Sequence, residues 1–157
     1  MNNTVKLIIS ITIPLMVGFT SGLFTTTGAG SWYQDIQRPS WNPPNWIFAP
    51  VWTTLYVMMG ISWFLIWRSD VKRSSKRTTA LFFIGQLILN FSWSVIFFYF
   101  HQPGWAFVEI IILWLMILGT ILSFSKISKL AAWLLVPYIS WVSFATILTY
   151  TIWRMNS

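Results

Sequence analysis

Residues 32–60 read WYQDIQRPSWNPPNWIFAPVWTTLYVMMG and join a proline-rich loop to a long apolar run. Pro39, Pro43 and Pro44 restrict the backbone of the loop, because each pyrrolidine ring fixes φ. Tryptophans stand at 32, 41, 46 and 52, and the whole chain has 12 of them. Tryptophan combines a large apolar ring with one N–H donor, so it suits membrane interfaces and pockets for flat ligands.

Composition places the chain among membrane proteins. Of its 157 residues, 56% are hydrophobic and only 8% are charged, whereas a soluble domain has about 25% charged residues. The net charge of +7 does not indicate nucleic acid as a partner, because the basic residues lie between apolar runs and fit anionic lipid headgroups better. With no cysteine and a single histidine, we expect neither a metal site nor a cofactor.

Five apolar runs are long enough to cross a bilayer as helices, which takes about 20 residues. We expect an all-α integral membrane protein, a single domain over residues 1–157 that forms a bundle of five transmembrane helices. The expected spans are 5–27, 46–67, 79–100, 105–124 and 130–153, and residues 28–45 form a long loop after the first of them. The first run exceeds the 7–15 apolar residues or so of a signal peptide, so we interpret it as a retained span.

Basic residues are distributed unequally between the two ends of the predicted bundle. Eight lie on the side of the N-terminus, namely Lys6, Arg68, Lys72, Arg73, Lys76, Arg77, Lys126 and Lys129, against Arg38 and Arg154 on the other side. The positive-inside rule then predicts a cytoplasmic N-terminus, with the proline-rich loop and the C-terminus on the opposite side of the membrane.

Two glycines and one carboxylate in the predicted spans each have two interpretations. Gly18 and Gly22 form a small-xxx-small pair that serves either dimerisation or packing inside the bundle. Glu109, one turn into the fourth span, is either a proton or cation site or a carboxylate bonded near a helix start. Asp35 and Asp70 lie in loops, so paired-carboxylate catalysis has no support.

A polar stripe runs through the third span. Gln86, Asn90 and Ser94 are four residues apart and therefore share one helix face, together with the neighbouring Trp93 and Phe97. A buried amide in a bilayer must find partners, so the stripe either links helices or lines a pocket.

The last span contains a proline and a pairing of a large with a small side chain. Pro137 lies inside this span and predicts a bend in it. Ala145 follows Trp141 by four residues and leaves space beside its indole. Bulky aromatics beside small residues can leave a flat slot between helices.

The motifs in this order and spacing resemble those of the translocator protein family, also known as the tryptophan-rich sensory proteins or peripheral benzodiazepine receptors. The resemblance covers nearly the whole chain. The matching positions include Trp32-Tyr33, Pro39-Ser40-Trp41, Pro43-Pro44, Leu89-Asn90, Gly104-Trp105-Ala106, Pro137-Tyr138 and Phe144-Ala145-Thr146.

The resemblance implies a five-helix bundle with an internal pocket that is covered by the loop after the first helix. It implies porphyrins such as protoporphyrin IX, isoquinoline carboxamides and, in animal members, sterols as ligands. The matching pocket positions are Phe48, Ala49, Val51, Trp52, Tyr56, Asn90, Trp93, Trp105, Val108, Ile112, Trp141, Ala145 and Leu148. Some bacterial members are proposed to degrade porphyrin in light, which would make Trp52 and Trp141 catalytic.

Two details at the C-terminal end qualify the resemblance. Thr149 stands where the family often has asparagine. The sterol motif survives in form as Leu148, Tyr150 and Arg154, a pattern that also describes an ordinary interfacial anchor at a helix end.

Three functions follow as hypotheses. The first is a membrane receptor for porphyrins and other flat apolar ligands. The second is a light-dependent porphyrin-degrading enzyme, and the third is a small proton-coupled transporter that uses Glu109. We expect a homodimer in contact with membrane lipid, in a bacterial plasma membrane rather than a mitochondrial outer membrane.

Overall fold

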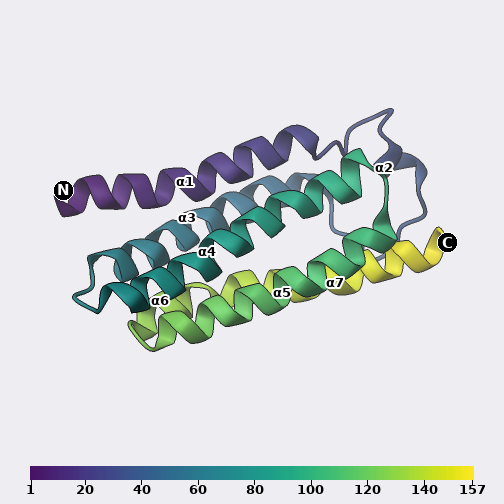
Figure 1. Cartoon of the computed structure of the whole chain (residues 1–157). Helices are drawn as coiled ribbons and strands as arrows, with labels where there is room; N and C mark the ends of the chain where they lie inside the picture. Colours follow the sequence, from purple (N-terminus) through teal and green to yellow (C-terminus); the bar gives the residue numbers. More distant parts are fainter.

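The computed structural model describes all 157 residues and contains helices without strands. The elements are α1 (Asn3–Phe24), α2 (Trp32–Asp35), η1 (Asn45–Ile47), α3 (Phe48–Arg68), α4 (Arg73–Ser94), η2 (Val95–Tyr99), α5 (Pro103–Ser125), α6 (Lys129–Leu134) and α7 (Val136–Met155). The long helices run side by side, and the chain termini lie at opposite ends of the bundle (Figure 1).

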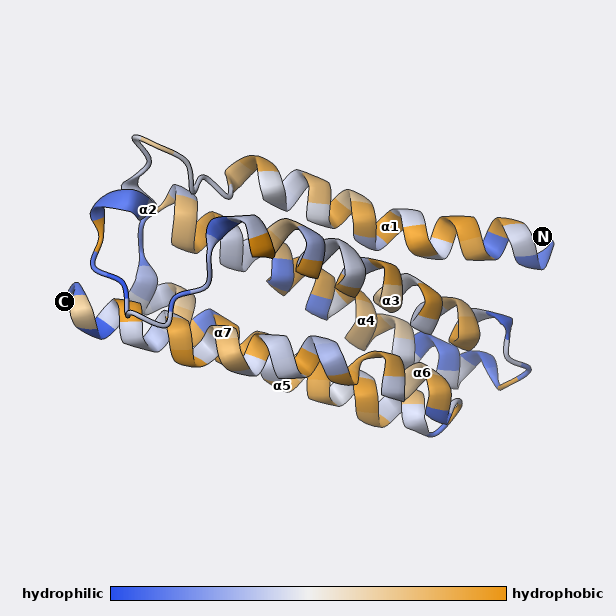
Figure 2. Cartoon of the chain, turned by 180° about the vertical axis from the view of Figure 1, so that it is seen from behind, coloured by the Kyte–Doolittle hydropathy of each residue, from blue (hydrophilic) through white to orange (hydrophobic).

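Five helical segments are long and apolar enough to span a membrane, which confirms the predicted fold class. Hydrophilic segments gather at the two ends of the bundle, and apolar residues dominate the helices between them (Figure 2). The third segment begins at Arg73, earlier than the predicted residue 79, because its first turns carry the basic residues. There, the Lys76 ammonium donates a hydrogen bond of 3.0 Å to the carbonyl of Trp67 at the end of α3.

Glycines bring α1 into close contact with α3. A Cβ added to Gly60 would lie 2.5 Å from Cα of Ile11 and 2.7 Å from the carbonyl oxygen of Ser10, so the two backbones nearly touch. Gly18 faces the ring of Tyr56, whereas a Cβ at Gly22 would meet no atom within 4 Å. Of the two interpretations of the glycine pair, Gly18 therefore serves packing inside the bundle, and the homodimer stays a prediction.

The fifth span is broken at Leu135 into α6 and α7. Pro137 is the second residue of α7, where its missing N–H costs no helical bond, so the predicted bend is a short break between two helices. Before the break, α6 packs against α3, and Ser62 Oγ donates a hydrogen bond of 2.7 Å to the Ala131 carbonyl. After the break, α7 packs mainly against α5, where Trp114 Nε1 donates a hydrogen bond to Ser143 Oγ at 2.8 Å. The break lets α7 diverge from α3, and the space between them becomes part of a cavity.

The third span ends in a π-helical turn, η2, which the sequence analysis did not foresee. Such wider turns insert an extra residue and often occur at functional sites. Phe97 and Phe98 of η2 are both buried, and they form the surface on which α2 rests. His101 follows with a φ of 55° in the short connection to α5, and its ring stacks on Trp32.

The orientation in the membrane is open to a direct test. Ser31 lies in the loop before α2, and Ser75 lies in the first turn of α4 at the other end of the bundle. Because the chain has no cysteine, Ser31→Cys and Ser75→Cys are clean single probes. We expect an impermeant thiol reagent applied to intact cells to label Ser31→Cys, and Ser75→Cys only after lysis. Labelling of both from the same side would refute the five-span topology, and the reverse pattern would refute the cytoplasmic N-terminus.

Candidate functional site: a cavity inside the bundle

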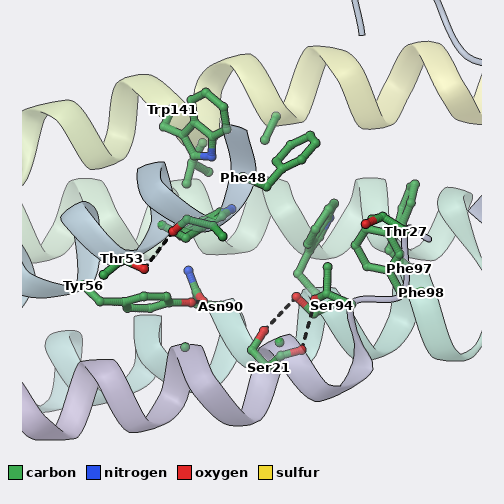
Figure 3. Close-up of a pocket in the computed structure, with 18 of the residues that line it drawn as sticks. Ser21, Thr27, Phe48, Thr53, Tyr56, Asn90, Ser94, Phe97, Phe98 and Trp141 are labelled. Carbon is green, nitrogen blue, oxygen red and sulfur yellow. Dashed lines mark hydrogen bonds between the residues drawn. The ribbon is translucent and has the colours of Figure 1, made fainter. Parts of the chain in front are cut away.

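The half of the bundle nearer the C-terminus contains a partly open cavity of about 710 Å³, within the range of about 300–1,000 Å³ typical of small-molecule pockets. It lies between α1, α3, α4 with η2, and α7, and α5 contributes only Ile110 and Leu113. Figure 3 shows aromatic side chains from three of these elements around the space, with the α1 backbone along one side.

Aromatic rings form most of the cavity wall on the side of α3 and α7. The Trp141 ring lies 6.2 Å from that of Phe48, and the Trp52 ring lies 5.6 Å from that of Tyr56. These edge and tilted contacts hold the rings in place while leaving faces free. The contact between Phe48 and Trp141 bridges α3 and α7, where the helices themselves do not pack closely.

A chain of hydrogen bonds crosses the bundle beside the cavity. The Tyr56 hydroxyl donates to Asn90 Oδ1, Asn90 Nδ2 donates to the Tyr138 hydroxyl at 2.9 Å, and Tyr138 donates to Gln86 Oε1 at 2.7 Å. Tyr56 and Asn90 line the cavity, whereas Tyr138 and Gln86 lie behind them. One N–H of Asn90 is used by Tyr138, which leaves the second available.

The same polar stripe continues toward the loop. Ser21 of α1 donates a hydrogen bond of 2.8 Å to Ser94 of α4, and both residues line the cavity (Figure 3). Both interpretations of the stripe therefore apply: Gln86 links helices, while Asn90 and Ser94 link helices and also face the cavity.

The loop between α1 and α3 covers the end of the cavity that lies nearest the C-terminus. Thr27, Tyr33 and Asn45 contribute to its lining. Tyr33 is only 2% exposed and packs against Phe97 and Phe98, so the loop is an ordered part of the site.

Comparisons with known proteins place this architecture in a family. Residues 10–154 match the model of the TspO/MBR family. The chain belongs to the TspO/MBR family. It is 42% identical to the tryptophan-rich protein TspO of Chlorobaculum tepidum, over 90% of each chain, and 39% identical to that of Archaeoglobus fulgidus, over 99% of each. It is 37% identical to the translocator protein of Bos taurus, over 92% of this chain and 86% of the relative.

The cavity of this TspO/MBR protein brings together nine of the thirteen positions that the resemblance implied. These nine are Phe48, Ala49, Trp52, Tyr56, Asn90, Trp93, Trp141, Ala145 and Leu148. They come from α3, α4 and α7 and lie on the sides of these helices that face the cavity. Their contact with a ligand stays a prediction.

The other four implied positions lie outside the lining of the cavity, and their contact with a ligand likewise stays a prediction. Trp105, Val108 and Ile112 are 69%, 47% and 49% exposed and lie on the outward stripe of α5. Val51 packs against the main core instead. A spacing of three and four residues defines one helix face, but it does not say whether that face points inward. The inward residues of α5 at the cavity are Ile110 and Leu113.

The first helix is the largest contribution that the sequence analysis missed. Its lining residues include Thr12, Gly18, Ser21 and Gly22, and its C-cap residue Thr25 also contributes. From Gly18 on, their spacing of three or four residues forms a stripe of small and polar side chains in an otherwise apolar helix. This stripe is the signal that could have indicated an inward face.

The three residues of the sterol motif point in different directions. Leu148 is buried in the cluster beneath the loop, while the half-exposed Tyr150 packs on Phe107 at 5.1 Å. Arg154 is exposed in the last turn of α7. Thr149, which replaces the expected asparagine, lines the cavity and donates a hydrogen bond of 2.7 Å to the Ala145 carbonyl.

Glu109 lies on the buried face of α5, and neither of its carboxylate oxygens has a hydrogen-bond partner in the chain. It is absent from the lining of the cavity. Glu109 is interpreted either as a carboxylate bonded near a helix start or as a proton or cation site. The structure shows no hydrogen bond for the first interpretation. The second stays untested.

Proposed function

We propose that this member of the TspO/MBR family is a membrane receptor that binds flat apolar ligands, in particular porphyrins such as protoporphyrin IX and isoquinoline carboxamides. The observation that carries the proposal is the cavity of about 710 Å³ with aromatic walls and a few polar atoms. The names of relatives, which include a translocator protein and a tryptophan-rich sensory protein, agree with a role in binding at a membrane.

Binding would combine ring contacts with a small number of polar anchors. The faces of Trp52 and Trp141 offer flat apolar contact, and the second N–H of Asn90 offers a donor to a ligand carbonyl or carboxylate. The helices that line the cavity are candidate membrane spans, and an apolar ligand would enter from the membrane. We also propose a bacterial plasma membrane as the location and a homodimer as the assembly.

A second candidate function, light-dependent oxidative breakdown of porphyrin with dioxygen as the oxidant, is favoured by the position of Trp52 and Trp141 in the cavity wall. We do not propose the proton-coupled transporter, because Glu109 lies outside the lining.

Titration of the purified protein with protoporphyrin IX, in the dark and under light, tests both candidates. We expect Trp52→Phe and Trp141→Phe to keep most of the affinity in the dark, because phenylalanine preserves a ring, with a loss of about two- to tenfold. If turnover occurs, both variants should lose it, since phenylalanine is far harder to oxidise than tryptophan.

Trp133→Phe is the matched control, because Trp133 is exposed on α6 and lies outside the cavity. No saturable binding to the wild type in the dark would refute the receptor. An unchanged porphyrin spectrum under light would refute the enzyme alone. Equal effects of all three substitutions would show that these tryptophans are not part of the site.

A further inference from the structure

The outward side of α3 is recessed between its neighbours. α3 has no large hydrophobic side chain that is exposed, whereas α1, α4, α5 and α7 each have several. Gly60 meets the backbone of α1, and Ser62 donates a hydrogen bond to Ala131 of α6. Since successive residues of an α-helix are about 100° apart, Ile61 lies on the face of α3 between these two contacts.

Three half-buried apolar residues form the floor of this recess. Met58, Ile61 and Leu65 are spaced by three and four residues, so they share one face of α3. On the flanking elements, Ile8 of α1 and Leu130 of α6 are exposed. We define the α3 furrow as Met58, Ile61 and Leu65 between α1 and α6. It is about 10 Å long, given the rise of an α-helix, and suits one extended hydrocarbon chain.

A polar groove lies where the α3 furrow meets the end of the bundle that carries the N-terminus (Figure 1). The groove has a volume of about 430 Å³, and its lining comes from the start of α1, the end of α3 and the residue before α6. These lining residues are Asn3, Leu65, Arg68, Ser69 and Ser128. Leu65 belongs to both features, so the polar groove and the apolar furrow are continuous.

The groove presents hydrogen-bond donors to its occupant. Arg68 is exposed, and its guanidinium carbon lies 5.5 Å from the centroid of the Phe64 ring, a contact that leaves five N–H donors free. Ser128 Oγ accepts a hydrogen bond of 3.2 Å from the N–H of Ala131, so its own O–H can donate. The amide of Asn3 adds two N–H groups. No carboxylate lines the groove, and this set of donors matches the oxygens of a phosphate.

The charges around the groove favour the same occupant. Eight of the ten basic residues of the chain lie on this side, and Asp70 is the only acidic residue there. Basic residues close to a bilayer surface attract anionic headgroups, whereas a zwitterionic headgroup gains little from them.

We propose that the groove and the α3 furrow together bind one anionic glycerophospholipid, in the leaflet on the N-terminal side. Arg68 binds the phosphate, Asn3 and Ser128 donate to its oxygens, and one acyl chain lies along the furrow. A soluble phosphate ester shares the headgroup chemistry, but it has no chain to fill the furrow. The site shares no residue with the lining of the cavity, so this inference stands independently of the receptor proposal.

Native mass spectrometry of the full chain, released from detergent, counts bound lipids and gives their dissociation constants. We expect one phosphatidylglycerol to bind about tenfold more tightly than phosphatidylcholine with the same acyl chains. Arg68→Gln should weaken the binding of phosphatidylglycerol about tenfold, since it removes the charged donors to the phosphate. Ile61→Trp should weaken it about threefold, because the indole fills the space of the acyl chain.

Matched controls separate the site from overall charge and from bulk. Arg73→Gln removes the same charge at the same end of the bundle, and Arg154→Gln removes it at the other end. Both residues lie outside the groove. Ile84→Trp adds the same bulk on the exposed face of α4. All three variants should bind phosphatidylglycerol as the wild type does, and sn-glycerol 3-phosphate at an equal concentration should not displace the lipid.

Equal weakening by Arg68→Gln and Arg73→Gln would show attraction by overall charge and would overturn the site. Equal binding of the two lipids would overturn it as well. Displacement by sn-glycerol 3-phosphate would show that the groove takes a soluble phosphate ester instead of a lipid. If Ile61→Trp bound phosphatidylglycerol as tightly as Ile84→Trp, the acyl chain would not lie in the α3 furrow.

Discussion

Gly60→Ala is expected to destabilise the protein severely, by about 3 kcal/mol or more, since overpacking that must displace backbone lies at the upper end of the usual range. The new Cβ would lie 2.5 Å from the Cα of Ile11 and 2.7 Å from the Ser10 carbonyl, and neither atom belongs to a flexible side chain. Relief requires a shift of α1 as a whole, which would also move one wall of the cavity. Thermal unfolding in detergent, followed by helical circular dichroism, measures the effect.

Gly22→Ala provides the control for this prediction. Gly22 lies in the same helix pair and has the same helix-propensity gain on substitution, but its Cβ would meet no atom within 4 Å. We expect its unfolding temperature to equal or exceed that of the wild type. If both alanine variants unfolded at the same temperature, the close approach of α1 and α3 would not be the reason for glycine at position 60.

Asn90→Leu is expected to lower the free energy of unfolding by about 1–3 kcal/mol. Leucine has nearly the shape of asparagine, but it leaves the Tyr56 hydroxyl as a buried donor without an acceptor, and it removes the donor to Tyr138. The double variant Asn90→Leu/Tyr56→Phe should recover most of this loss, because replacing both partners by apolar groups removes the unsatisfied donor.

The same pair of variants separates the two roles of Asn90. We expect the double variant to regain stability but to bind protoporphyrin IX about fivefold more weakly than the wild type, since the donor to the ligand is missing. Recovery of both stability and affinity would show that Asn90 links helices without contacting the ligand. Failure to recover stability would show that the hydrogen bond from Tyr56 is not what Asn90 contributes to folding.

The architecture was predictable from the sequence because the bilayer imposes a length on each apolar run, so five runs such as 105–124 gave five helices. The cavity was predictable on α3, α4 and α7, where polar or small residues such as Asn90 and Ala145 mark the inward face. On α5 the buried Ala106 and Glu109 mark the inward face in the same way, but Ile110 inside and Ile112 outside are equally apolar. In a bilayer, both environments favour the same side chain.

Features that depend on backbone detail were not predictable. The π-helical turn at Val95–Tyr99 is one such feature, because no residue type specifies it. The bonds between Asn156 and Gln37 join positions 119 residues apart, so only the folded chain reveals them. Pro137 predicted a bend, but its position in the first turn of a new helix became visible only with the break at Leu135.

The break at Leu135 also affects how such a protein can change over time. Because the divergence of α7 from α3 creates the space, substitutions at wall positions such as Ala145 or Phe48 alter the shape of the cavity without removing it. The residues that maintain the helix arrangement, such as Gly60 and Ser62, lie apart from the lining. At wall positions such as Ala145 and Phe48, new ligand preferences can therefore evolve through single substitutions while the scaffold stays constant, whereas Gly18, Asn90 and Ser94 serve both the cavity and the helix contacts.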